Sequence, residues 1–449
     1  MVSALARCDN VSFKGGCDGR DWPVGEVLMF SLLNLQSLLG LFVILAACWG
    51  LSENKRAFPW KLAIGAVVVQ ALLVLVLFNP ASHGVLHAVN GAVDGLAKAT
   101  SVGTNFVFGY LAGGQFAQPY SVQEPGALFT FAFQVLPLIL VISALSALLW
   151  HWKILKWITY GFGFLFQRTM GLGGASALAV AANIFLGMIE SPIVIRAYLD
   201  KLTRSELFLM MVVGLATVAG STMVAYALML APTLSNAAGH VLVASIISAP
   251  AGILLARIII PEKPGEGGAY AEYDSPLKYD SAIDAIVKGT SDGLMVVLNI
   301  SAVLIVFVAL VALVNIIVGA IFPGISVEWV LSWIFAPVAW LTGVQWADAR
   351  EAGLLLGVKL TQTEFKAFMD LGAVPAGEIS ERTRMLLTYA LCGFANIGSV
   401  GITVTGLSVL MPERREEVLG LVWKALFAGF LATLMSAAIV GVMPASIFG

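Results

Sequence analysis

Residues 183–192, NIFLGMIESP, decide the fold of this chain. They place one acidic residue, Glu190, inside an otherwise apolar run. An ionised carboxylate in hydrocarbon is costly unless it faces protein or water, so it indicates a functional site within a membrane. Gly187 and Pro192 flank Glu190, and because glycine permits a backbone reversal and proline lacks a donor, we predict two half-helices meeting near Gly187. The alternative is that Glu190 reaches an interface and the glycines merely pack helices.

The composition of the whole chain indicates an all-α polytopic membrane protein. Of 449 residues, 59% are hydrophobic and only 12% are charged, and the mean hydropathy is +0.91. A soluble globular protein carries about 25% charged residues. The net charge of −2 argues against a nucleic-acid partner. No cleavable signal peptide is recognisable, so the first apolar run is expected to remain in the membrane.

The first third of the chain predicts three spans with a defined orientation. Residues 52–56 form a basic loop, which the positive-inside rule places in the cytoplasm, with the N-terminus outside. Residues 79–125 hold one lysine and read as an external connection that carries an amphipathic helix. Aromatic and basic residues at 151–157 predict an interfacial cytoplasmic helix. The predicted spans are residues 27–50, 60–78 and 127–150.

The remaining chain contains two broken regions of the same plan. After the region 171–198 come a run with a polar centre, a plain span, a polar connection at 261–288 and a long helix at 291–321. Residues 347–371 are again glycine-broken and contain Glu364, and the next run, 385–411, is interrupted at 393–399. Paired interruptions in corresponding halves indicate a transporter binding site near the bilayer midplane. A pore or a receptor would not need interrupted helices in both halves of the chain.

These patterns divide the chain into five segments. An extracytoplasmic N-terminal segment precedes a scaffold of transmembrane, amphipathic and interfacial helices, and each hairpin repeat belongs to a transport domain. A polar linker and a long scaffold helix separate the repeats. In this order the segments are 1–26, 27–170, 171–260, 261–343 and 344–449. Cys8 and Cys17 can form a disulfide if the first segment faces an oxidising compartment, and two free thiols are an equal alternative.

Three stretches together resemble the concentrative nucleoside transporter family. They are residues 183–196, 214–221 and 389–396. The resemblance extends over most of residues 27–444. It implies eight spanning helices and two re-entrant hairpins per subunit, a homotrimer in a bacterial inner membrane, and nucleoside uptake by cation symport with an elevator-like motion. It implies no organic cofactor.

The resemblance also implies site residues by matched position. Glu364 would bind ribose hydroxyls, because a carboxylate accepts two adjacent hydroxyls through charge-assisted hydrogen bonds. Glu190 matches the first-hairpin glutamate of the family. The implied substrate site comprises Gly187, Met188, Ile189, Glu190, Thr222, Glu364, Phe394, Asn396 and Ser399. The implied sodium site uses the side chains of Asn183 and Thr217 and the carbonyls of Leu186 and Val218.

The chain departs from the family pattern where the base would bind. Met188 and Ile189 stand where characterised members carry glutamine and threonine, and neither can donate a hydrogen bond. Thr363 replaces an asparagine before Glu364, and Thr222 replaces an apolar residue. The residues expected to bind the ribose therefore match the family pattern, while those expected to bind the base differ from it.

Three other functions remain as alternatives. Proton coupling through Glu190 or Glu364 would replace sodium, because burial raises the pKa of a carboxyl group toward neutral pH. An intramembrane enzyme could use the two glutamates as an acid/base pair, although no histidine or cysteine stands beside either of them in the sequence. A passive channel would transport without a cation gradient.

Overall fold

The computed structural model describes residues 31–78, 83–112, 130–263 and 278–444, and these residues are mainly helical. The predicted segment 1–26, with Cys8 and Cys17, lies outside the described residues, as does part of the external connection. The first helices are α1 (Leu32–Gly50), α2 (Trp60–Leu77), α3 (His83–Phe108), α4 (Phe131–Gln134), α5 (Leu136–His151) and α6 (Ile154–Met170), with a short 3-10 turn, Gly109–Ala112, after α3.

The apolar helices of the described chain match the predicted number of spans. Seven helices are long and apolar enough to cross a membrane, and an eighth span results if α13 (Val327–Leu341) and α14 (Trp346–Thr361), which bend by 118°, count as one. A helix of about 20 apolar residues crosses a bilayer because its backbone groups bond internally. The all-α polytopic class with about eight spans is therefore confirmed.

Both predicted broken regions are present as half-helices. The first repeat consists of α7 (Gly174–Asn183), α8 (Glu190–Val194), a 3-10 turn (Arg196–Lys201), α9 (Arg204–Ala216), α10 (Gly220–Leu230) and α11 (Ala237–Ile259). The second consists of α14, α15 (Glu364–Ala373), α16 (Glu381–Leu391), α17 (Ile397–Leu410), a 3-10 turn (Pro412–Arg414) and α18 (Arg415–Val442). The break predicted near Gly187 lies between α7 and α8, as expected from glycine and proline in an apolar run.

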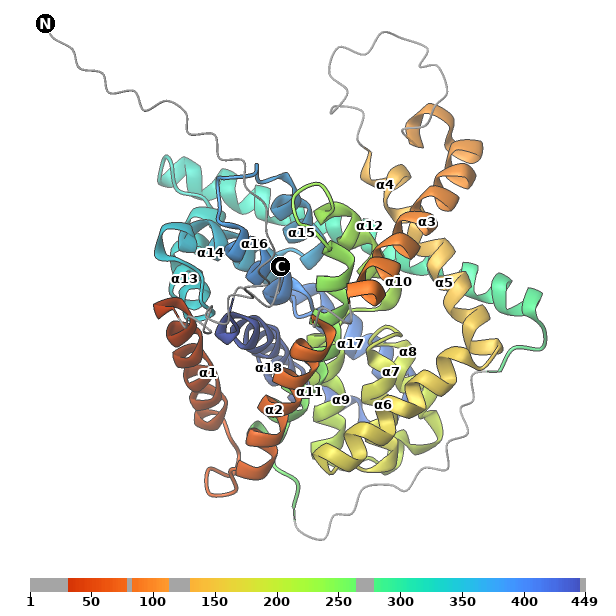
Figure 1. Cartoon of the computed structure of the whole chain (residues 1–449), viewed down its shortest axis with the longest axis horizontal. Helices are drawn as coiled ribbons and strands as arrows, with labels where there is room; N and C mark the ends of the chain where they lie inside the picture. The colour runs from red at the N-terminus through yellow and green to blue at the C-terminus, as the bar shows by residue number, and fades with distance from the viewer. Residues whose placement is uncertain (1–30, 79–82, 113–129, 264–277, 445–449) are drawn as a thin grey trace, which may run out of the picture.

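The last helix of each repeat forms the centre of the bundle. Figure 1 shows α11 and α18 in the middle, with α1 on one side and α5 and α6 on the other. About nine-tenths of the spanning window of each is buried: 94% for α11 and 89% for α18. The hydroxyls of Ser248 on α11 and Ser436 on α18 lie 3.0 Å apart. The two repeats thus meet along equivalent helices.

The long helix α12 (Ala282–Ile321) begins nearer the N-terminus than predicted. The polar connection was expected to reach residue 288 and the helix to start at 291. Instead Ser281 caps the helix by accepting from the backbone N–H of Asp284 at 3.1 Å. Lys288 and Asp284 then pair one turn apart, at 2.9 Å. Charged residues at this end suggested a loop, but a helix that emerges from the membrane can carry them on exposed turns.

Helix α13 is absent from the predictions. Its 15 residues are fewer than the ~20 required for a span, and it contains Pro337, which weakens the helical pattern. The helix nevertheless packs along α14. A Cβ atom on Gly353 would lie 2.5 Å from the carbonyl oxygen of Ser332, so the absence of a side chain permits this packing.

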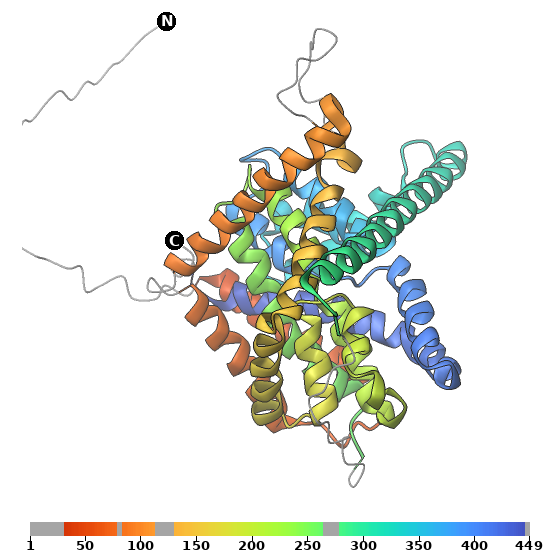
Figure 2. The ribbon, with the colours of Figure 1, turned by 90° about the vertical axis from the view of Figure 1, so that its right-hand side faces the viewer.

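Helix α12 packs on the body of the protein mainly through α5. Gly289 and Gly293 permit the approach, because a Cβ atom on either would lie within 3 Å of Ser143 or Ala147 of α5. The most apolar window of α12 is otherwise unburied. Figure 2 shows α12 projecting from the bundle. An apolar helix that is this exposed must be covered by lipid or by another protein surface.

Candidate substrate and ion site

A cavity of about 130 Å³ lies where the broken segments of both repeats meet. It contains eight of the nine predicted substrate residues, all except Glu190. Helix α12 closes one side. The lining residues are Gly187, Met188, Ile189, Ala219, Ser221, Thr222, Val296, Asn299, Ile300, Val303, Thr363, Glu364, Phe365, Phe394, Asn396, Ser399 and Ile402.

Glu364 is the buried carboxylate of this cavity. It is the first residue of α15, where the positive end of the helix dipole favours an anion. Its side chain is only 3% exposed. The hydroxyl of Tyr226 donates to Oε1 at 2.9 Å, and the amide Nδ2 of Asn396 donates to Oε2 at 2.6 Å. Each oxygen therefore already accepts one hydrogen bond and has further acceptor capacity.

The orientation of Asn396 follows from the unwound segment that holds it. Asn396 precedes the first residue of α17, and its Oδ1 accepts from the backbone N–H of Ser399 at 2.8 Å. The amide NH₂ is then left to face Glu364. Nearby, the backbone N–H of Phe394 donates to the carbonyl of Thr217 at 3.3 Å, which joins the unwound segments of the two repeats.

The opposite wall of the cavity is apolar. Ile189 packs against Gly406, where a Cβ atom would lie 3.1 Å from Ile189 Cγ1. The sulfur of Met188 lies 3.7 Å from the hydroxyl of Thr403. The hydroxyl of Thr222 donates to the carbonyl of Ala219 at 2.9 Å, so its proton is engaged by the backbone. This wall offers shape and dispersion rather than a paired set of donors.

Glu190 faces a different cavity. This second cavity, of about 180 Å³, is also lined by Asp292 of α12 and Tyr279. Gly187 lines both cavities, and its lack of a side chain leaves room for the Glu190 carboxylate. The structure therefore brings Glu364, Asn396 and the hairpin tip together and places Glu190 beside them, in the adjoining space.

The predicted ion ligands lie at the ends of broken helices. Asn183 is the last residue of α7 and is 1% exposed, and neither polar atom of its side chain has a hydrogen-bond partner in the described chain. Thr217 follows α9, with its hydroxyl 2.9 Å from the carbonyl of Val213 and 3.3 Å from that of Asn183. A buried, unpaired amide oxygen beside freed carbonyls is the kind of oxygen set that binds sodium in broken-helix transporters. The residues present therefore fit the ion.

Comparison with known proteins identifies the family. The chain is 38% identical to "Uncharacterized transporter YutK" of Bacillus subtilis, covering 91% of this chain and 98% of the relative. It is 34% identical to "Nucleoside permease NupC" of Helicobacter pylori, over 91% and 97%. Two family models described as Na+ dependent nucleoside transporter, N-terminus and C-terminus, match residues 39–111 and 240–441, and one described as Nucleoside recognition matches 132–233. The chain belongs to the concentrative nucleoside transporter family.

A solved structure and a mammalian relative extend this result. The transporter is similar to the structure titled "Structure of CNTnw in an inward-facing substrate-bound state", with a TM-score of 0.84 and 34% identity over 93% of this chain and 100% of that one. It is 32% identical to "Sodium/nucleoside cotransporter 1" of Rattus norvegicus, over 99% of this chain and 71% of the relative. The family consists of multi-pass transporters, not enzymes, which removes the enzyme alternative.

Several residues at or near the cavity are not among the site residues predicted from the sequence. Tyr226 donates to Glu364 but is not among them, although it lies one helical turn after Thr222 and so on the same face of α10. Lys359, which is fully buried in α14, is also not among them. The contribution of α12, through Val296, Asn299, Ile300 and Val303, has no local sequence signal. It depends on how α12 crosses the two repeats.

Proposed function

We propose that the protein is a sodium-coupled symporter that takes up nucleosides or a closely related ribosyl solute. The observation that carries this proposal is the position of Glu364, whose two oxygens face a cavity built from both broken repeats. A carboxylate is suited to a vicinal diol, because it can accept both hydroxyls through charge-assisted bonds. Asn396 and Ser399 supply further polar contacts to the sugar, and Phe394 packs against the nucleoside.

Binding requires the cavity to enlarge. Its volume of about 130 Å³ is below the roughly 300 Å³ at which ligand pockets begin. Tyr226 and Asn396 both donate to Glu364. Entry of the ribose adds its hydroxyls to the remaining acceptor sites of the carboxylate or displaces Tyr226. Either exchange keeps the buried charge satisfied throughout.

For coupling, we propose that Asn183, Thr217 and the carbonyls of Leu186 and Val218 hold sodium. The unpartnered Asn183 amide supports this assignment, and a relative named as a sodium/nucleoside cotransporter supports the ion. The alternative is proton coupling through Glu190. It is favoured by the second cavity, where Glu190 and Asp292 line the same small space.

The proposed movement carries the two repeats, residues 171–260 and 344–449, across a static frame that includes α5 and α12. The glycine-lined contact between α5 and α12 supports a rigid pair, because it leaves no room for side chains to interleave differently. We further propose a homotrimer in the cell inner membrane with the N-terminus outside. The exposed apolar length of α12 supplies a surface for contacts between subunits.

The apolar wall formed by Met188 and Ile189 predicts weak discrimination among nucleobases. Uptake in proteoliposomes of uridine, cytidine, adenosine, guanosine and inosine, with and without sodium, tests both the function and this prediction. Affinities should differ by much less than a hundredfold, because shape and dispersion cannot select a base edge. A hundredfold selection of uridine over purines, about 2.7 kcal/mol, would contradict it.

A matched variant sharpens this experiment. Replacing Met188 by Gln and Ile189 by Thr introduces donors at the base without touching Glu364. Discrimination should then rise about tenfold or more, since each unpaired polar contact disfavours the wrong base. Absence of transport for every nucleoside in the wild type would reject the proposed function itself.

A further inference from the structure

Lys359 is a fully buried cation that the substrate site does not use. Its Nζ donates to the carbonyl of Ala390 at 2.7 Å and to the hydroxyl of Thr433 at 2.8 Å. The ring centroid of Phe430 lies 5.3 Å away. Among the described residues, the hydrogen-bond partners of Lys359 Nζ are this carbonyl and this hydroxyl, and no acidic side chain is among them. A buried ammonium held by a carbonyl and a hydroxyl has the surroundings of a bound cation.

The position of Lys359 corresponds to the proposed sodium site of the other repeat. Asn183 ends α7, the first helix of its hairpin, and Lys359 lies in the last turn of α14, the first helix of the second hairpin. Ala390 lies in the final turn of the half-helix α16, as the carbonyls near Thr217 lie at the end of α9. The negative ends of both half-helices therefore face a cationic position.

The central helices give the same correspondence independently. Ser248 and Ser436 mark the contact between α11 and α18. Ser245 and Thr433 precede them by the same interval. Ser245 donates to the carbonyl of Val218, a proposed sodium ligand, at 3.3 Å, whereas Thr433 accepts from Lys359. Equivalent hydroxyls thus border the proposed ion in one repeat and the ammonium in the other.

One difference between the repeats explains why the second position holds an ammonium. Thr217 follows α9 with a hydroxyl, whereas the residue that follows α16 is Cys392. A thiol is a poor ligand for a hard cation, which prefers oxygen. We propose that the Lys359 ammonium is a tethered cation that fills the second ion position, so the transporter couples one free sodium to each substrate. This inference rests on the proposed function.

The test uses purified full-length protein and two substitutions that differ in the space they leave. Lys359→Ala removes the charge and opens room for a small cation, while Lys359→Met removes the charge but fills the space. Both should weaken uridine binding at least tenfold by calorimetry. Propylammonium, which resembles the deleted part of the side chain, should restore binding and raise the melting temperature of Lys359→Ala only. A purely structural lysine would also allow propylammonium to raise the melting temperature of Lys359→Ala, but the uridine affinity of Lys359→Met would then stay at the wild-type value.

Two outcomes would overturn the proposal. Wild-type uridine affinity in Lys359→Met would show that the charge is not needed. A Hill coefficient of two for sodium in the wild type, where one is expected, would show that a second free ion binds. The stabilisation of Lys359→Ala by propylammonium is measured without nucleoside, so it stands even if nucleosides prove not to be substrates. If neither variant folds, the wild-type sodium titration still decides.

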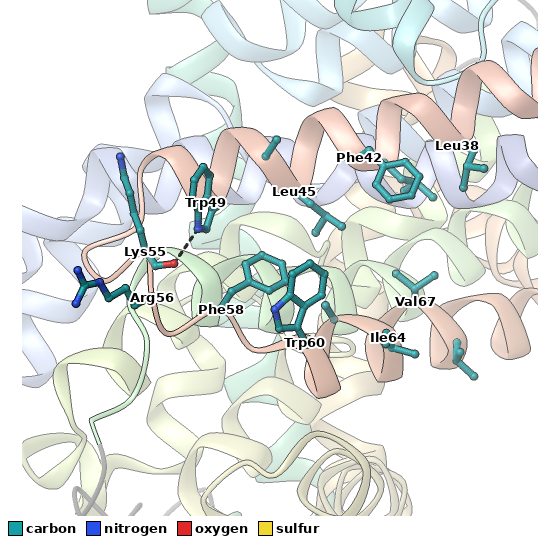
Figure 3. A pocket seen from close by; sticks show the side chains of 14 residues that line it. Leu38, Phe42, Leu45, Trp49, Lys55, Arg56, Phe58, Trp60, Ile64 and Val67 are labelled. Atoms are coloured by element: carbon teal, nitrogen blue, oxygen red, sulfur yellow. Dashed lines mark hydrogen bonds between the residues drawn. The ribbon is translucent and has the colours of Figure 1, made fainter.

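A separate observation concerns the groove between α1 and α2. Figure 3 shows that its sides are apolar, with Leu38 at one end and Trp49, Phe58 and Trp60 toward the other. Its volume is about 710 Å³. The loop that joins the two helices ends the groove, and Trp49 Nε1 donates to the carbonyl of Lys55 there at 2.9 Å. Tryptophans near the ends of spanning helices, as at the loop end of this groove, are typical of a membrane interface.

The charge of the lining residues and the length of the groove indicate which kind of molecule binds there. Lys55 and Arg56 line the loop end, and among the described residues neither pairs with a carboxylate, because Glu53 binds Arg204 and Lys424 instead. None of the 14 lining residues is acidic. From Leu38 to Trp49 the helix rises roughly 16 Å, at about 1.5 Å per residue. This is about the depth of one leaflet of a bilayer whose hydrocarbon core is ~30 Å thick.

We propose that the groove binds one phospholipid with an anionic headgroup. An acyl chain lies between α1 and α2, and the phosphate, whose negative charge no headgroup cation neutralises, lies against Lys55 and Arg56. The tryptophans flank the glycerol region. Zwitterionic lipid of the same chain length fits the apolar part but gains less from the two basic residues.

Native mass spectrometry of the detergent-purified protein tests this site. Phosphatidylglycerol should bind at least tenfold tighter than phosphatidylcholine with the same acyl chains. The double variant Lys55→Gln/Arg56→Gln should lose this preference, while Lys153→Gln/Lys156→Gln, a matched change outside the groove, should keep it. Ala46→Trp narrows the groove and should weaken both lipids. Equal binding of the two lipids by the wild type, or full preference in the groove double variant, would overturn the proposal.

Discussion

Replacing Glu364 by Gln should abolish tight nucleoside binding while the protein still folds. The neutral amide has one acceptor oxygen instead of two, and its NH₂ group cannot accept from a ribose hydroxyl. A hydrogen bond to a charged group contributes about 1.5–3 kcal/mol. Loss of even one such bond weakens binding roughly ten- to hundredfold, and loss of both removes measurable calorimetric binding.

The control for this prediction is Glu378→Gln, which makes the same chemical change at an exposed position. It should leave uridine affinity unchanged. Size-exclusion profiles and melting temperatures of both variants establish that folding is retained. Wild-type affinity in Glu364→Gln would remove this carboxylate from the substrate site, whatever the family relationship.

Replacing Asn183 or Thr217 by Ala should raise the sodium concentration for half-maximal uptake about tenfold or more. Each substitution deletes one oxygen from the proposed ion site, and a tenfold change corresponds to about 1.4 kcal/mol. Maximal uptake at saturating sodium should recover, because neither residue lines the substrate cavity. Uptake of labelled uridine into proteoliposomes over a sodium series measures both quantities.

Ser301→Ala is the matched control, since Ser301 donates to its own helix on α12 and lies outside the site. The pH dependence of uptake should be the same in all these proteins. Full uptake in sodium-free buffer, driven by an inward proton gradient, would reject the sodium site. It would move the coupling role to Glu190, beside Asp292 in the second cavity.

The broken helices could be predicted from sequence because their causes are local. Gly187 lies in the break between α7, which ends at Asn183, and α8, which begins at Glu190, and Pro192 falls in the first turn of α8, where its missing donor is tolerated. By contrast, the start of α12 depended on Ser281 and on an ion pair at an exposed turn. Charge in a membrane protein does not by itself distinguish a loop from a helix that leaves the bilayer.

The composition of the site could be predicted only in part. Glu364, Asn396 and the hairpin tip were expected together because the family pattern marks them, and the structure brings them to one cavity. The hydrogen bond between Tyr226 and Glu364 joins residues far apart in sequence. Glu190 faces the neighbouring space because the chain turns between α7 and α8. Contacts of this kind arise from packing between repeats, which no short stretch encodes.

The backbone bond from Phe394 to Thr217 has a thermodynamic consequence. Phe394 lines the proposed nucleoside cavity, and Thr217 belongs to the proposed ion site. We therefore expect binding of either ligand to affect the geometry of both unwound segments. The two segments pack closely at Gly393, because a Cβ atom there would lie 2.7 Å from the carbonyl oxygen of Ala216. Linkage then requires reciprocity: the factor by which sodium tightens nucleoside binding equals the factor by which nucleoside tightens sodium binding.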